Sequence, residues 1–192
     1  MRASSLALAL GLLLFATFPL PAQSAGEVRA VLISGPEVGH RAPDFTLPWA
    51  NREGVGSADE PYQLYRDRGK TVVITFYARD FTQTCTTELR TLAERYDSIF
   101  GDGVVVVAIS ADSVATHGRF ASSLNLPFRL LSDPQQRVAR KYGSYGSNGF
   151  PRHTVFVIGP DGKVKYRNMS FDPMQPKHYA DLGAAIRTTR GS

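Results

Sequence analysis

Two runs of β-branched and apolar residues, separated by a stretch with helical periodicity, constrain the fold of this chain more than any other feature. Residues 71–77 (TVVITFY) and 104–109 (VVVVAI) are nearly continuous apolar runs, which is typical of strands buried on both faces. From Cys85 on, apolar residues recur at helical spacing, which predicts an amphipathic helix of about four turns that ends at Gly101 and Gly103. A strand, a helix and a strand in this order predict a βαβ unit with two parallel strands.

The rest of the chain adds an antiparallel half to this parallel unit. Residues 160–163 (PDGK) form a turn between two short extended runs, which predicts a β-hairpin. A parallel half joined to an antiparallel half gives an α/β domain with a mixed central β-sheet flanked by helices, which is the thioredoxin-like layout. The elements expected after the βαβ unit are a helix over 114–124 capped by Asp112 or Ser113, an extended segment at 127–131, a short helix over 133–142, the hairpin strands 155–158 and 164–167, and a terminal helix over 177–190.

The beginning of the chain differs in composition from the rest. A single positive charge precedes an apolar stretch at 6–15, and prolines and small residues follow it, which is the layout of a secretory signal peptide. Cleavage is expected after Ser24 or Ala25. The apolar stretch is shorter than the roughly 20 residues that span a membrane. The alternative to a cleaved signal peptide is an uncleaved helix that anchors the protein in the membrane. We therefore expect a signal peptide over 1–25, a single domain over 26–192, and a periplasmic or secreted protein.

The charge and the cysteine content exclude several classes of protein. Lys and Arg number 22 and Asp and Glu 17, so the net charge is +5, and no basic cluster predicts nucleic-acid binding. One cysteine excludes an intramolecular disulfide, a CxxC pair and a four-cysteine zinc site within the chain. His40, His117 and His178 lack the spacing of metal ligands, so no metal or cofactor is assigned.

Cys85 lies where the loop after the first buried strand enters the helix. Free N–H groups and the macrodipole at a helix start both favour a thiolate. Lowering a thiol pKa by two units requires about 2.7 kcal/mol, whereas a helix end supplies about 0.3–1 kcal/mol, so a reactive Cys85 needs a second contributor, most simply a cation. Thr82 shares a helix face with Cys85 and can donate to the thiolate, or it can cap the helix, as Asp80 can. A buried, inert cysteine is the other interpretation.

The residues around Cys85 match a known family. The stretch FYARDFTQTCTTEL (76–89) resembles the peroxidatic loop of peroxiredoxins, whose signature is P-x-x-x-T-x-x-C. Thr82 and Cys85 match the signature, and Ala78 stands where the family has proline. Three further stretches, VGHRAPDFTLP (38–48), VVVVAISADS (104–113) and LPFRLLSDP (126–134), resemble the Q-type or bacterioferritin-comigratory branch, so that the resemblance covers about residues 38–170.

The resemblance implies a role for each matched residue. Cys85, as a thiolate, would attack the terminal oxygen of a peroxide, release water or an alcohol and become a sulfenic acid. The Thr82 hydroxyl and the N–H groups around Thr84 and Cys85 would bind the peroxide. Ala78, in place of the proline that shields the thiolate, implies a looser and slower site.

The family's cation is an arginine that precedes a late strand. Arg152 is predicted to take this position, next to the strand at 155–158. His153 is the alternative, since an ungapped count from the following turn gives this residue and Arg152 requires a bulge. Glu88 is predicted to orient the arginine, or to act as a surface partner of the helix dipole.

The position of the family's resolving cysteine holds Arg90, and the chain has no second cysteine. The resemblance therefore implies an exported one-Cys thiol peroxidase that reduces hydrogen peroxide and organic hydroperoxides and is regenerated by an external thiol. The reductant would be a thioredoxin-like protein or a small thiol, and the enzyme a monomer or weak dimer. Two alternatives are a catalytically weak holdase or binding protein of thioredoxin fold, and an exported thioredoxin-like thiol-disulfide reductase, which the lack of CxxC disfavours.

Overall fold

A mixed sheet of seven strands forms the centre of the molecule. The computed structural model describes residues 34–191, so the predicted signal peptide over 1–25 lies outside the described residues. The strand order is β3-β2-β7-β6-β5-β8-β9, with β5, β6 and β7 parallel and the other neighbours antiparallel. The strands are β1 (Thr46–Leu47), β2 (Trp49–Asn51), β3 (Gly54–Val55), β4 (Tyr62–Gln63), β5 (Thr71–Phe76), β6 (Val104–Ser110), β7 (Arg129–Ser132), β8 (Thr154–Ile158) and β9 (Val164–Asn168), and β1 and β4 form a separate pair.

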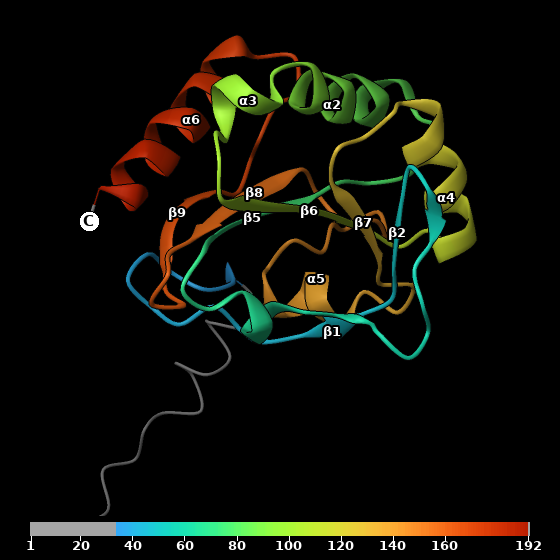
Figure 1. Ribbon diagram of the computed structural model, residues 1–192, viewed down its shortest axis with the longest axis horizontal. Coiled ribbons are helices and arrows are strands. Elements are labelled where there is room, and N and C mark those ends of the chain that lie inside the picture. Colours follow the sequence, from blue (N-terminus) through green and yellow to red (C-terminus); the bar gives the residue numbers. More distant parts are fainter. Residues whose placement is uncertain (1–33, 192) are drawn as a thin grey trace, which may run out of the picture.

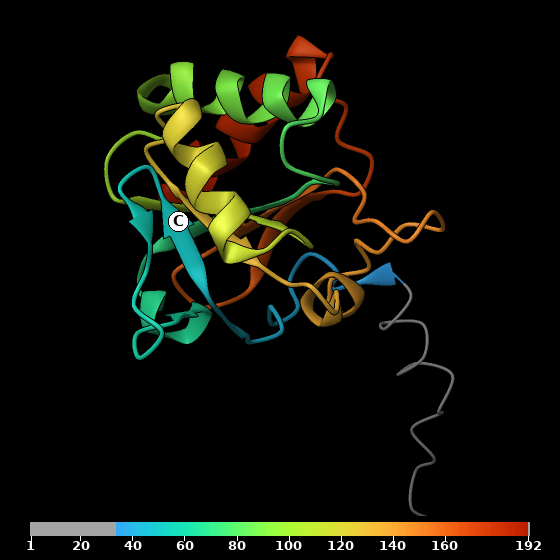
Figure 2. The same ribbon diagram turned by 90° about the vertical axis from the view of Figure 1, so that its right-hand side faces the viewer.

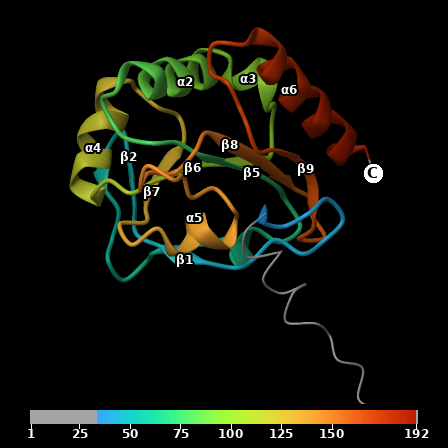
Figure 3. The ribbon, with the colours of Figure 1, turned by 180° about the vertical axis from the view of Figure 1, so that it is seen from behind.

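Helices cover both faces of this sheet (Figures 1 and 3). One face carries α2 (Gln83–Glu94), α3 (Tyr96–Ile99) and α6 (Pro176–Arg190), and α4 (Val114–Ser123) packs beside β2, β3 and β7. The other face carries α5 (Arg137–Lys141), the β1–β4 pair and the short 3₁₀ helix η1 (Leu64–Asp67). The predicted α/β layout, a mixed sheet flanked by helices, is confirmed. Between residues 34 and 191, no helix is both long enough and apolar enough to cross a membrane.

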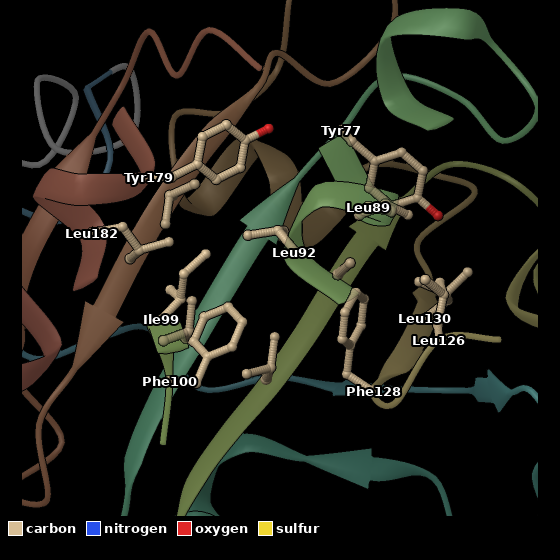
Figure 4. Close-up of a cluster of buried hydrophobic side chains, with 14 of the residues drawn as sticks. Tyr77, Leu89, Leu92, Ile99, Phe100, Leu126, Phe128, Leu130, Tyr179 and Leu182 are labelled. Atoms are coloured by element: carbon tan, nitrogen blue, oxygen red, sulfur yellow. The ribbon is translucent and has the colours of Figure 1, made fainter. Parts of the chain in front are cut away.

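The central strand β5 separates two hydrophobic cores. All six of its residues are buried, and their side chains alternate between the two faces as strand geometry requires. Val73 belongs to the core beneath α2, α3 and α6, while Val72 and Ile74 belong to the core on the α5 side. Figure 4 shows part of the first core, in which the labelled side chains are Tyr77, Leu89, Leu92, Ile99, Phe100, Leu126, Phe128, Leu130, Tyr179 and Leu182.

The predicted four-turn helix is two helices in the structure. α2 begins at Gln83, two residues before Cys85, and ends at Glu94. Arg95 leaves the helical region with φ −105° and ψ 18°, and α3 follows at once. Beyond this break Ile99 and Phe100 are both buried in the core. The apolar spacing therefore marks one continuous buried surface, although two helices form it instead of one.

Two helix starts show which side chains serve as caps. Ser113, one of the two predicted caps of α4, accepts a hydrogen bond from the Thr116 N–H at 3.2 Å. Asp133, predicted to open a helix, lies before α5, and its carboxylate accepts bonds of 2.9–3.0 Å from the N–H groups at the start of that helix. These bonds satisfy donors that have no partner within the helix.

Replacing Val107 in β6 by alanine tests the buried sheet. Val107 is fully buried, so Val107→Ala removes two buried carbons and leaves a cavity, and we expect the free energy of unfolding to fall by about 2 kcal/mol. Val55 is 56% exposed, so the matched change Val55→Ala should shift it by about 0.5 kcal/mol or less. Equal effects of the two changes, measured by denaturant unfolding, would contradict this packing.

Candidate active site

The cysteine lies at the start of α2, at the edge of the sheet where the parallel strands end. Cys85 is the third residue of α2 and is 1% exposed. β5 ends at Phe76, and the chain reaches α2 through the loop at 78–82. Figure 2 shows this end of α2 and the loop that precedes β8 on the same side of the molecule. The position predicted from the sequence is confirmed.

A histidine faces the sulfur. Nε2 of His153 lies 3.7 Å from Sγ of Cys85. Burial raises the pKa of the Cys85 thiol, but the hydrogen bonds from His153, Thr82 and the Arg79 backbone outweigh it and hold the pKa below its usual value. Burial likewise lowers the pKa of His153, but hydrogen bonds and charges from Cys85 and Glu88 outweigh it and raise this pKa to about 10. Both shifts favour the thiolate of Cys85 and the imidazolium of His153.

A buried carboxylate holds the histidine in place. Glu88, one turn after Cys85 on α2, is fully buried and accepts a hydrogen bond from Nδ1 of His153. Its other oxygen accepts a bond of 2.7 Å from the Thr75 hydroxyl of β5. Glu88 does orient the cation, as predicted, but that cation is a histidine. The alternative of a surface partner for the helix dipole is wrong, because the side chain has no solvent exposure.

The prediction that Arg152 is the cation beside Cys85 is wrong. Arg152 is exposed, and its guanidinium donates at 2.5 Å to the carbonyl oxygen of Gly143. Side chains alternate along an extended chain, and β8 pairs with β5 without interruption; the register shift between β8 and β9 places its extra residue in β9. Val155 faces the α2 side and Phe156 the α5 side. His153 lies two residues before Val155, so its side chain points to the same α2 side. This agrees with the alternative prediction, in which His153 takes the position of the cation.

Three other predicted residues lie around the thiol. Thr82 adopts the extended conformation of an N-cap, but its side chain makes no capping bond; its hydroxyl donates to the Arg79 carbonyl at 3.1 Å and lowers the pKa of Cys85. Ala78 and Thr84 line an open groove of about 570 Å³, together with His153. The groove reaches His153, whose ring contacts the thiol, and continues along the segment at 169–173.

A second histidine–carboxylate pair holds the loop before α2. His117 is fully buried and places Nδ1 2.8 Å from Asp80 Oδ2 and Nε2 3.2 Å from the Leu131 carbonyl oxygen. The Tyr77 hydroxyl donates to the other Asp80 oxygen at 2.6 Å. Asp80 therefore does not cap α2. The next residue, Phe81, has φ 59°, a strained conformation for a residue other than glycine, which this anchored loop maintains.

Sequence reasoning missed Thr75 and the role of His117. Thr75 is the one threonine or serine inside the apolar run at 72–77, and this exception was the signal for a buried polar partner. His117 had no such signal, because its partners come from two segments that are distant from it in the chain, the loop at 77–80 and β7. In the described range 34–191, no three His, Cys, Asp or Glu side chains gather closely enough to hold a metal ion.

Comparison with known proteins assigns the chain to a family. Residues 38–167 match the model of the AhpC/TSA family. The chain belongs to the AhpC/TSA family. It is 32% identical over 136 residues to peroxiredoxin Bcp of Bacillus subtilis, covering 67% of this chain and 82% of that protein. It is 31% identical over 162 residues to the chloroplastic peroxiredoxin Q of Arabidopsis thaliana, covering 82% and 70%.

A solved structure agrees with these relatives. The crystal structure of peroxidoxin BcpB from Mycobacterium tuberculosis superposes with a TM-score of 0.64 and 30% sequence identity, over 80% of this chain and 97% of that one. The predicted thioredoxin-like fold and the resemblance to Q-type and Bcp-type peroxiredoxins are confirmed. The AhpC/TSA relatives indicate a thiol-dependent peroxidase, which is an oxidoreductase.

The ion pair predicts how the thiol titrates. Replacing His153 by glutamine removes the cation but leaves Cys85 buried, so we expect the pKa of the thiol to move upward in His153→Gln. The thiolate absorbance near 240 nm and the rate of alkylation by iodoacetamide, each followed against pH, report this shift.

The exposed His40 provides a control for this titration. His40→Gln should leave the titration of Cys85 unchanged, since its side chain lies on the surface. A Cys85 titration that is the same in His153→Gln and in the unaltered protein would show that His153 does not stabilise the thiolate.

Proposed function

We propose that this chain is a one-Cys peroxiredoxin in which Cys85 reduces hydrogen peroxide and organic hydroperoxides. The observation that carries the proposal is the 3.7 Å contact between the Cys85 sulfur and His153 at the start of α2. A helix N-terminus and an imidazolium together supply the stabilisation that neither the buried thiol nor the helix end has alone. The thiolate attacks the terminal peroxide oxygen, and the sulfur becomes a sulfenic acid as the O–O bond breaks.

The groove that His153 lines supports organic hydroperoxides as substrates in addition to hydrogen peroxide. Its volume of about 570 Å³ exceeds the needs of hydrogen peroxide, and Met169 and Phe171 supply apolar surface within it. Peroxide oxygens would bind to the Thr82 hydroxyl and to the N–H groups of Thr84 and Cys85, which point out of the first turn of α2. The small side chain of Ala78 leaves this end of the groove open.

An external thiol completes the reaction in this proposal. The chain contains one cysteine, and Arg90 occupies the position at which the resemblance to the Q-type branch implies a second one. One thiol attacks the sulfenic acid sulfur and forms a mixed disulfide with release of water. A second thiol then reduces that disulfide and returns Cys85 to the thiolate. A thioredoxin-like protein or a small thiol supplies both equivalents, and we propose that the enzyme acts as a monomer or weak dimer.

We also propose export to the periplasm or the medium. The support is the signal-peptide layout of residues 1–25, with its short apolar stretch and its small residues at Ala22 and Ala25. Sequencing the N terminus of the protein recovered from outside the cytoplasm tests this; an intact Met1 on that protein would contradict cleavage.

Loss of the sulfur tests the enzymatic assignment. We expect Cys85→Ser to abolish the consumption of hydrogen peroxide and of cumene hydroperoxide with dithiothreitol as donor, because no other group in the chain can form a sulfenic acid. A holdase of the same fold would keep its activity against aggregating client protein in this variant. Peroxide consumption by folded Cys85→Ser protein, or an unreactive Cys85 in the unaltered protein, would contradict the proposal.

A matched pair at Thr82 tests the binding of the peroxide. Thr82→Ser keeps the hydroxyl and should retain most of the rate, whereas Thr82→Val keeps the shape and should lower the rate constant about 10-fold or more, as expected for one lost hydrogen bond to the reacting group. Equal rates for the two variants would show that the hydroxyl does not bind the peroxide.

A further inference from the structure

The cation at this site can release its proton, which an arginine cannot do. A guanidinium stays protonated at any physiological pH, so it can attract a thiolate but cannot act as an acid. Breaking the O–O bond expels hydroxide or an alkoxide, which needs a proton to become water or an alcohol. His153, 3.7 Å from the sulfur, places such a proton next to the reacting atoms.

The hydrogen bonds of His153 determine which of its two ring nitrogens delivers the proton. Nδ1 of His153 faces the Glu88 carboxylate, which only accepts, so this nitrogen keeps its hydrogen in both charge states of the ring. The mobile proton is therefore on Nε2, the nitrogen that faces Cys85. A peroxide bound against the sulfur brings its second oxygen within reach of the same N–H group.

We propose that His153 is a catalytic acid that protonates the leaving oxygen of the peroxide, and that its ring afterwards accepts the proton of the second thiol, which reduces the mixed disulfide and releases Cys85 as a thiolate. This rests on the proposed role of Cys85 as the peroxidatic nucleophile. The thiolate forms an S–O bond with the terminal oxygen, which keeps its hydrogen. The O–O electron pair departs on the other oxygen, which takes the Nε2 proton. The thiolate is oxidised to sulfenic acid, the peroxide is reduced to water or an alcohol, and the ring is left neutral.

The surroundings of the ring support a cycle of protonation. Hydrogen bonding and charge from the thiolate help to raise the pKa of His153. When the thiolate becomes a neutral sulfenic acid, this contribution is lost, and the pKa of the ring falls. The His153 side chain is 19% exposed toward the groove, where incoming thiol arrives. Asp172 and Arg152 also line this groove, and Tyr179 of α6 lies near Glu88, so these are the other titratable groups that face the pair.

A comparison of two peroxides tests the proposal. Hydrogen peroxide expels hydroxide, which needs a proton, whereas peracetic acid expels acetate, which does not. The rate constants for oxidation of reduced protein by each are measured in single turnovers at one pH, with dimedone trapping and intact mass as readout. Their ratio cancels any change in the fraction of thiolate, because the same thiolate attacks both peroxides.

The variants His153→Arg and His153→Gln separate charge from proton donation. The first keeps a cation and the second removes it, but neither offers an acidic proton. We expect the ratio of the peracetic acid rate to the hydrogen peroxide rate to rise about 100-fold or more in both, the usual contribution of a general acid. His40→Gln, at an exposed position, should leave the ratio unchanged.

The possible failures are distinguishable. A ratio that stays within about threefold of the unaltered protein in the folded variants would overturn the role of His153 as an acid and leave Cys85 as the nucleophile. If the unaltered protein forms no sulfenic acid at Cys85 with either peroxide, the proposed function itself fails, and this inference with it.

Discussion

A carboxylate that is entirely removed from solvent, Glu88, determines the arrangement of the site. An unpaired buried charge is costly, so Glu88 requires close hydrogen bonds and a cation. The Thr75 hydroxyl supplies one bond at 2.7 Å, and the His153 imidazolium supplies the other bond together with the charge. The ring, fixed in this way, has its second nitrogen directed at Cys85. The pKa of the thiol, which burial alone would raise, is thereby held below its usual value.

The fold supplies this site through two matching histidine–carboxylate pairs, one on each side of the cysteine loop. His153 and Glu88 hold the thiol after the start of α2. His117 and Asp80 hold the loop before it, with Nδ1 of His117 2.8 Å from the Asp80 carboxylate and Nε2 3.2 Å from the Leu131 carbonyl oxygen. Because the carboxylate of each pair is buried, neither side of the loop can shift without breaking a hydrogen bond to a buried carboxylate. Such support is what pre-organises a reactive group.

The sequence predicts the frame of this molecule better than it predicts the contacts of the site. Hydrophobic periodicity located the buried strands, and the place of Cys85 at the start of α2 followed from that order. The error at Arg152 arose because one residue of register along a strand reverses the direction of a side chain, and residue types near a turn do not fix the register. The pairing of β8 with β5 does fix it, and it turns His153 inward. The buried partners of Glu88 and His117 come from segments far apart in the chain, which periodicity does not connect.

The charge on His153 is the most direct measure of this account. Nitrogen chemical shifts of ¹⁵N-labelled histidine rings report the protonation state of each ring, and comparison with His153→Gln assigns the signal. The account predicts a doubly protonated ring in the reduced protein at neutral pH that titrates well above the usual range of histidine, near 10. It also predicts that the titration moves to lower pH in Cys85→Ser, where the thiolate is absent. A neutral His153 ring in the reduced protein at pH 7 would contradict the account.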